Sequence, residues 1–290
     1  INGGTFQGKY AYGWINLLDH KITINGGLVD NGTWNTGGFF DDDLEEGIGT
    51  LIKVSPITGL DLGFGMYGNL KDDNKLGFSD AKYTVNLAYA MPEIFKFIAS
   101  YRPENKAESS TVLITGQVLA VSDLTAVFTG KLDTLTDFGD NGKIDIYEAL
   151  GYKIGGIKFG LDAAQFISQA ENSDIALYFN PWVSYTIETG RIGIVPRFDF
   201  VYVAAGQPYD ISWETEGLPI YSNYNFDCVS PVYNKDYSFL FIKPSVAFNI
   251  GDSFIQIGDV ISFENGPSKT WGTKDSRLAN AFYVEFCWSF

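Results

Sequence analysis

The chain has one histidine, His20, and two cysteines, Cys228 and Cys287, among its 290 residues. Zinc sites are built mainly from Cys and His, and catalytic nucleophiles commonly depend on a nearby histidine. With so few of these residues, we expect no enzyme activity and no cofactor. Basic residues are also scarce, at 20 against 35 acidic ones. The net charge of −15 argues against a nucleic-acid partner, because such surfaces need clustered Lys and Arg.

Long apolar runs are absent as well. Residues 111–128 come nearest, but Gln117, Ser122 and Asp123 interrupt them. A transmembrane helix needs about 18 predominantly apolar residues, so none is expected. The chain is nevertheless 45% hydrophobic and 16% aromatic, which excludes disorder. It begins at Ile1, and we expect that a signal peptide has been removed.

Apolar residues alternate with polar or small ones in many segments. In residues 191–204, the even positions include Ile194, Phe198 and Tyr202, whereas the odd positions include Arg197 and Asp199. A period of two is that of a β-strand with two different faces. The same period predicts fifteen strands, at 6–17, 22–29, 47–54, 59–69, 81–91, 95–101, 111–120, 124–132, 144–154, 157–167, 175–187, 191–204, 237–250, 253–263 and 278–290.

The connections between these strands are alternately short and long. The long ones are 30–46, 70–80, 102–110, 133–143, 168–174, 205–236 and 264–277, and each short one has five residues or fewer. Tight turns at one end and longer loops at the other are typical of an up-and-down transmembrane barrel. The long connections hold 23 of the 35 acidic residues and 9 of the 20 basic ones, so they carry nearly all of the net charge. Acidity is therefore expected at one rim.

The chain ends in a strand-like segment, residues 282–290, in which aromatic or branched residues alternate with others up to Phe290. This segment resembles the last strand of Gram-negative outer-membrane β-barrel proteins. The resemblance implies that Phe290 is part of the signal read by the barrel-insertion machinery, and that the chain lies in the bacterial outer membrane in contact with its lipid. Porins of this size are often trimers, so the resemblance also implies a possible homo-oligomer.

We therefore expect an all-β fold, a transmembrane antiparallel barrel of about 16 strands that forms a single domain over residues 1–290. Single-chain bacterial barrels have even strand numbers with both ends inside, so a sixteenth strand is expected upstream of Ile1 or within 205–236. Sixteen strands leave an aqueous channel. Charged residues facing a cavity inside a membrane protein mark the path of water and ions. The alternation predicts thirteen pore-lining residues: Lys53, Asp61, Lys96, Arg102, Lys131, Asp145, Lys153, Lys158, Asp162, Arg197, Asp199, Lys243 and Glu285. The alternative is that these charges pair and only brace the wall.

Two long outer loops, 30–46 and 205–236, carry further signals. The first has no base and holds Asp41, Asp42, Asp43, Glu45 and Glu46 beside aromatic residues. It could constrict the channel, contact a neighbouring subunit or form a solvated acidic tip. The second holds six aromatic residues and could cap the pore.

Residues 137–148 partly match the spacing of an EF-hand calcium loop, with Asp137, Asn141, Asp145 and Glu148 as possible ligands. Gly139 stands where a ligand is needed, and the flanks are predicted strands, so a chance hairpin loop is the alternative. Glu148 is also expected on the lipid-facing side of its strand.

The function that these observations favour is an outer-membrane porin, a water-filled channel for passive diffusion of ions and small hydrophilic solutes. The alternative is a surface structural protein or adhesin, in which the barrel only anchors acidic loops that contact partners or neighbouring subunits.

Overall fold

The computed structural model describes residues 11–29, 47–70, 76–104, 109–135, 139, 142–169, 175–204, 207–208, 229–230, 238–251, 253–265 and 276–287. The chain divides into two compact units, which we describe separately. The first contains residues 1–120 and 129–138, and the second contains residues 121–128 and 139–290. No helix in the described ranges is long and apolar enough to cross a membrane.

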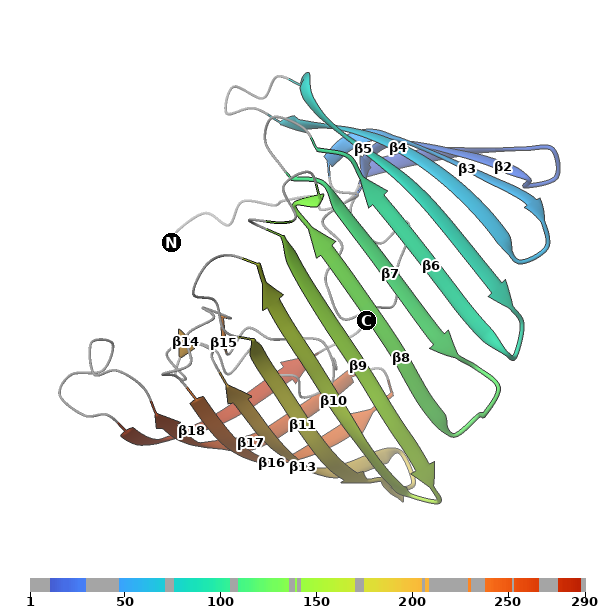
Figure 1. Ribbon diagram of the computed structural model, residues 1–290. Coiled ribbons are helices and arrows are strands. Elements are labelled where there is room, and N and C mark those ends of the chain that lie inside the picture. Colours follow the sequence, from blue (N-terminus) through green and yellow to red (C-terminus); the bar gives the residue numbers. More distant parts are fainter. Residues whose placement is uncertain are drawn as a thin grey trace, which may run out of the picture. The chain divides into compact units, whose positions relative to one another are not determined.

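Long antiparallel strands make up both units (Figure 1). The first unit holds β1 (Ala11–Leu17), β2 (Ile22–Val29), β3 (Gly47–Ile57), β4 (Leu60–Leu70), β5 (Leu76–Met91), β6 (Phe95–Arg102) and β7 (Thr111–Val118). Strand β8 (Leu124–Asp133) has residues in both units. The second unit holds β9 (Lys143–Ile154), β10 (Ile157–Ser168), β11 (Ala176–Tyr185), β12 (Ile187–Thr189), β13 (Ile192–Ala204), β14 (Gln207–Pro208), β15 (Val229–Ser230), β16 (Ser238–Ile250), β17 (Ser253–Asn265) and β18 (Ser276–Cys287).

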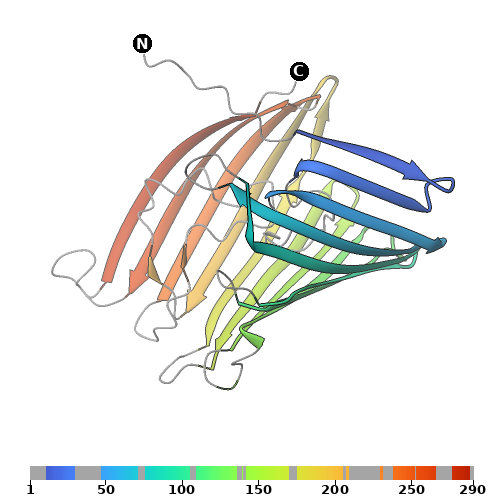
Figure 2. The same ribbon diagram turned by 90° about the horizontal axis from the view of Figure 1, so that it is seen from above.

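The strands form one 16-stranded sheet in which neighbours follow the chain order. Figure 2 shows β9, β10, β11, β13, β16, β17 and β18 following one another in this way, from yellow-green to red. Strands β11 and β12 both pair with β13 in the same register, with Ser184 opposite Arg197 and Ile187 opposite Ile194. They are therefore two parts of one strand that is interrupted near Thr186. Apart from this interruption, the fifteen expected strands correspond to those observed. The all-β, antiparallel up-and-down architecture is thus confirmed.

Within 205–236, the described strands are β14 and β15, which pair with each other and not with the main sheet. The other residues of that segment lie outside the described ranges. A strand upstream of Ile1 stays a prediction.

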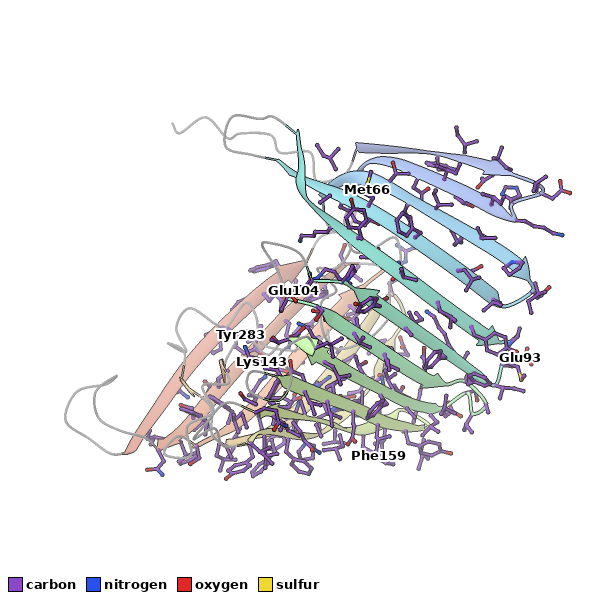
Figure 3. All side chains as sticks on the ribbon, turned by 45° about the horizontal axis from the view of Figure 1, so that its top comes forward. Met66, Glu93, Glu104, Lys143, Phe159 and Tyr283 are labelled. Atoms are coloured by element: carbon purple, nitrogen blue, oxygen red, sulfur yellow. The ribbon has the colours of Figure 1, made fainter. Side chains whose placement is uncertain are left out.

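Short connections join alternate strands at one end. Figure 3 labels Glu93, in the turn between β5 and β6, and Glu104, beyond the opposite end of β6. The short turns use left-handed backbone, for example at Gly59 (φ 83°), where an added Cβ would collide with the carbonyl oxygen of Ala90. Glycine adopts this conformation without steric cost, which explains why tight turns can close this end. His20 lies in such a turn.

The burial pattern of the strands differs from that in a soluble protein, because large apolar side chains are exposed along one side while the other side buries polar side chains together with apolar ones such as Phe239 and Val201. On β13, Phe198 is 44% exposed, whereas the adjacent Asp199 is 2% exposed. Large apolar side chains are exposed on every long strand from β3 to β18, and Phe159 is an example in Figure 3. We call their side of the strands the apolar face and the opposite side the polar face. Thr84, Asn86, Asn180, Gln256 and Ser262 are almost fully buried on the polar face.

Glycines on the polar face lie beneath aromatic rings of the neighbouring strand. Gly160 faces Trp182, Gly49 faces Tyr67 and Gly258 faces Tyr283. A Cβ added at Gly160 would lie 2.5 Å from the Trp182 ring, and additions at the other two glycines would also meet the ring. These pairings account in part for a chain that is rich in both residue types.

Candidate functional site on the polar face

All thirteen charged residues predicted to line a pore lie on strands, at positions that alternate with the exposed apolar residues. The polar face therefore holds the whole predicted set, which is Lys53, Asp61, Lys96, Arg102, Lys131, Asp145, Lys153, Lys158, Asp162, Arg197, Asp199, Lys243 and Glu285. That these residues line a channel stays a prediction.

In the first unit, charged groups are linked across neighbouring strands. Lys53 on β3 lies 3.9 Å from Asp61 on β4. Near the other end of the strands, Arg102 donates to Thr111 Oγ1 over 3.1 Å, and Thr111 donates to Asp133 over 2.7 Å. Lys131 lies 3.4 Å from Asp133 on the same strand. These contacts link charged side chains within the first unit, and whether the charges line a channel or only brace the wall stays a prediction.

In the second unit, Asp162 collects donors from the strands on both sides of β10. Tyr147 Oη on β9 donates to one carboxylate oxygen over 3.2 Å, and Trp182 Nε1 on β11 donates to the other over 3.0 Å. Asp162 itself is 2% exposed. A buried carboxylate is costly unless it is hydrogen-bonded, so these two aromatic donors hold it in the wall.

Arg197 and Asp199 form the second network. Arg197 Nε and Nη2 donate to the two oxygens of Asp199 over 2.8 and 2.6 Å, and Asn180 donates to Asp199 over 3.2 Å. The Arg197 guanidinium also lies 4.4 Å from the centre of the Trp182 ring. Lys243 on β16 is directly opposite Asp199 in the sheet register. Asp199 therefore has Arg197 as its partner on the same strand and Lys243 opposite it on the next.

The polar face of the second unit also contains a hollow of about 450 Å³ beside the short turns. Lys153, Lys158, Arg197 and Trp182 line it, together with several hydroxyl groups. Lys158 Nζ lies 5.4 Å from the centre of the Trp182 ring. The predicted pore-lining residues therefore include members of an ion pair, such as Asp199, and cations that face an open space, such as Lys153 and Lys158.

Some residues of these networks were missing from the predicted set. Tyr147, Asn180 and Trp182 hold the buried carboxylates, and Asp133 completes the network of Arg102. The alternation of residues places the first three on the polar face, so their positions could have been found by the same pattern. The predicted pore-lining set, however, contains only charged residues. Asp133 was assigned to a loop, whereas it ends β8.

Several predicted features lie outside the described residues. These are the acidic residues Asp41, Asp42, Asp43, Glu45 and Glu46, the calcium-loop residues Asp137 and Asn141, and Phe290. Glu148 is exposed on the apolar face, as expected from the alternation. No cluster of three or more His, Cys, Asp or Glu suited to a metal ion occurs among the residues that the structure does describe. A calcium loop stays a prediction.

Comparison with known proteins gives likeness of structure only. No protein-family model matches the chain, and no curated protein matches it. A crystal structure of a variant of OccD1 (OprD) is similar with a TM-score of 0.55 at 12% identity, over 91% of this chain and 75% of that one. OprD of Pseudomonas aeruginosa is similar with a TM-score of 0.51 at 12% identity, over 93% and 78% of the two chains. OccK7 (OpdD) of the same organism gives 0.51 at 12% identity, over 92% and 75%.

These likenesses show the fold. The chain has the antiparallel up-and-down β-barrel fold, which the resemblance of its C-terminal segment had implied.

Proposed function

We propose that the chain is a bacterial outer-membrane porin, through which ions and small hydrophilic solutes diffuse passively. The observation that supports this most directly is the row of exposed large apolar side chains along one side of the strands, opposite a side with buried charged and polar groups. Exposed apolar side chains suit lipid, and a charged, hydrogen-bonded face suits water. The likeness to OprD, which one comparison names an outer membrane protein, supports the same location.

We propose no catalytic role for the chain, since a passive channel requires none. The partners of this function are outer-membrane lipid, ions and small solutes. Recognition of Phe290 by the barrel-insertion machinery and assembly into trimers belong to the proposal. Light scattering of the detergent-solubilised protein would measure the number of copies in the assembly.

A matched pair of cysteine variants tests the channel. Ser184 and Val183 are adjacent on β11, but Ser184 lines the hollow on the polar face and Val183 is exposed on the apolar face. Each is replaced by cysteine in a background with Cys228→Ser and Cys287→Ser. A charged, water-soluble thiol reagent is then added during single-channel recording in a planar bilayer.

We expect the reagent to change the conductance of Ser184→Cys channels and to leave Val183→Cys channels unaltered. A folded protein that gives no openings at all would remove the porin proposal. An equal response of both variants would show that the polar face does not line the conducting path.

A second function, a surface structural protein or adhesin, is favoured by the acidity of the long connections, which hold 23 of the 35 acidic residues. It predicts a silent bilayer together with binding to cells or to neighbouring copies. Replacing the loop acids Asp41, Asp42, Asp43, Glu45 and Glu46 by amides would abolish that binding and leave the fold intact. Unchanged binding after this replacement would exclude this role for the loop.

A further inference from the structure

The hollow on the polar face of the second unit has the chemistry of an anion site. Its lining includes Lys153, Lys158 and Arg197 as bases and Asp123 as an acid. Hydroxyl groups surround them, from Ser122, Thr125, Ser184, Thr186 and Ser245. Ammonium and hydroxyl groups can all donate hydrogen bonds, so the hollow presents many donors to whatever occupies it.

Two of these bases, Lys153 and Lys158, lie side by side on neighbouring strands. Lys153 on β9 is directly opposite Lys158 on β10 in the sheet register, and both project from the polar face. Like charges directly opposite each other destabilise a strand pair. Among the residues that the structure describes, no carboxylate forms an ion pair with either ammonium within 4.0 Å. An anion between them would remove the repulsion.

The arrangement also distinguishes between kinds of anion. Arginine recognises planar carboxylates through a fork of two donors, and the Nε–Nη2 fork of Arg197 is already occupied by both oxygens of Asp199. What remains for a ligand is mainly a pair of lysine point charges with hydroxyl donors on several sides, beside the Nη1 end of Arg197. That set suits a tetrahedral oxyanion, whose oxygens point in four directions, better than a planar group.

Neighbouring residues hold the Trp182 side chain, which forms one side of the hollow, in place. Trp182 is held by its hydrogen bond to Asp162 and packs over Gly160, while the Arg197 guanidinium lies on the Trp182 ring. Lys158 also lies near this ring. Hydrogen bonds and packing therefore preorganise one side of the hollow, which lowers the cost of ordering it around a ligand.

We propose that this hollow binds a tetrahedral oxyanion of the phosphate or sulfate kind, held by Lys153 and Lys158. The proposal rests on the porin function only in placing the site beside the diffusion path. Binding itself can be measured on protein that conducts nothing, so the two proposals can fail separately.

Isothermal titration calorimetry of the folded full chain tests the site. The protein is kept in a nonionic detergent without phosphate groups, at constant ionic strength set by chloride, and is titrated with inorganic phosphate, with sulfate and with acetate. The test variants are Lys153→Gln with Lys158→Gln, and Lys158→Gln alone. The control is Lys96→Gln, which removes the same charge from the same face, opposite Gln117 on β7.

We expect phosphate and sulfate to bind in a single-site manner and acetate to bind more weakly. The double variant should lose about tenfold or more in affinity, which corresponds to about one strong charge-assisted contact, and Lys96→Gln should bind like the natural chain. Lys158→Gln alone should show a smaller loss, which keeps the test available if the double variant does not fold. Equal phosphate binding by all variants, acetate binding as tight as phosphate, or no binding by the natural chain would each overturn the proposal. If the protein bound phosphate but showed no channel activity, the anion site would be supported and the porin proposal would be contradicted.

Discussion

At the scale of single residues, Arg197 and Asp199 show how charges are held within the wall. They lie two positions apart on β13, form two hydrogen bonds and are largely buried, with side-chain exposures of 12% and 3%. Removing one partner of a buried pair leaves the other charge uncompensated, which typically costs about 3–5 kcal/mol. We therefore expect Asp199→Asn to lower the free energy of unfolding by about 3 kcal/mol, measured by urea titration in lipid vesicles.

Asp61 provides the control for this prediction, because its pair with Lys53 is longer, at 3.9 Å, and both side chains are more than one third exposed. Asp61→Asn should change the free energy of unfolding by less than about 1 kcal/mol, since exposed pairs contribute little. If both substitutions had the same small effect, the Arg197 pair would not stabilise the wall.

At the scale of elements, the strands were largely predictable because their alternation directly reflects two different environments. The start of β5 was predicted five residues too late, at 81 instead of Leu76. Leu76 and Gly77 pair with Leu70 and Asn69 at the end of β4, across a shift in register that the residue pattern does not reveal. The pairing of glycines with aromatic rings could not be predicted. It depends on the register between strands, which brings Gly160 opposite Trp182 although they are 22 positions apart.

The glycine at position 160 allows a prediction at this scale. A methyl group added there would lie 2.5 Å from Trp182 and 2.6 Å from the carbonyl oxygen of Leu150, so the ring must move away from Asp162. We expect Gly160→Ala to destabilise the fold by about 1–3 kcal/mol, the range for overpacked sites, and to shift the tryptophan emission spectrum.

Gly151 is a matched control, because it is opposite Gly160 on β9 but an added Cβ would make only ordinary contacts, from 3.5 Å upward. Gly151→Ala should leave both the stability and the emission spectrum nearly unchanged. An equal loss in both variants would show that glycine is needed here for backbone reasons and not for the ring.

At the scale of the whole molecule, the proposed outer-membrane location predicts that stability depends on the lipid that meets the exposed apolar side chains. Placing a charge in a bilayer costs most free energy at its centre and little near its interfaces. A charge on the apolar face should therefore lower the free energy of unfolding by an amount that depends on its depth. Phe198 is at the middle of β13, and Ile192 is at its first position on the same face.

We expect Phe198→Arg to cost about 2–4 kcal/mol in lipid vesicles and Ile192→Arg to cost at most about 1 kcal/mol. Reversible urea titration of the two variants and the natural chain would measure both changes. The physical reason is that the arginine at position 198 cannot reach the water interface without distorting the strand, whereas the one at position 192 is already close to it. In water, the two substitutions would have the same cost in free energy of unfolding, because water is equally close to both positions. Equal measured costs would therefore mean that the apolar face does not meet the hydrocarbon core.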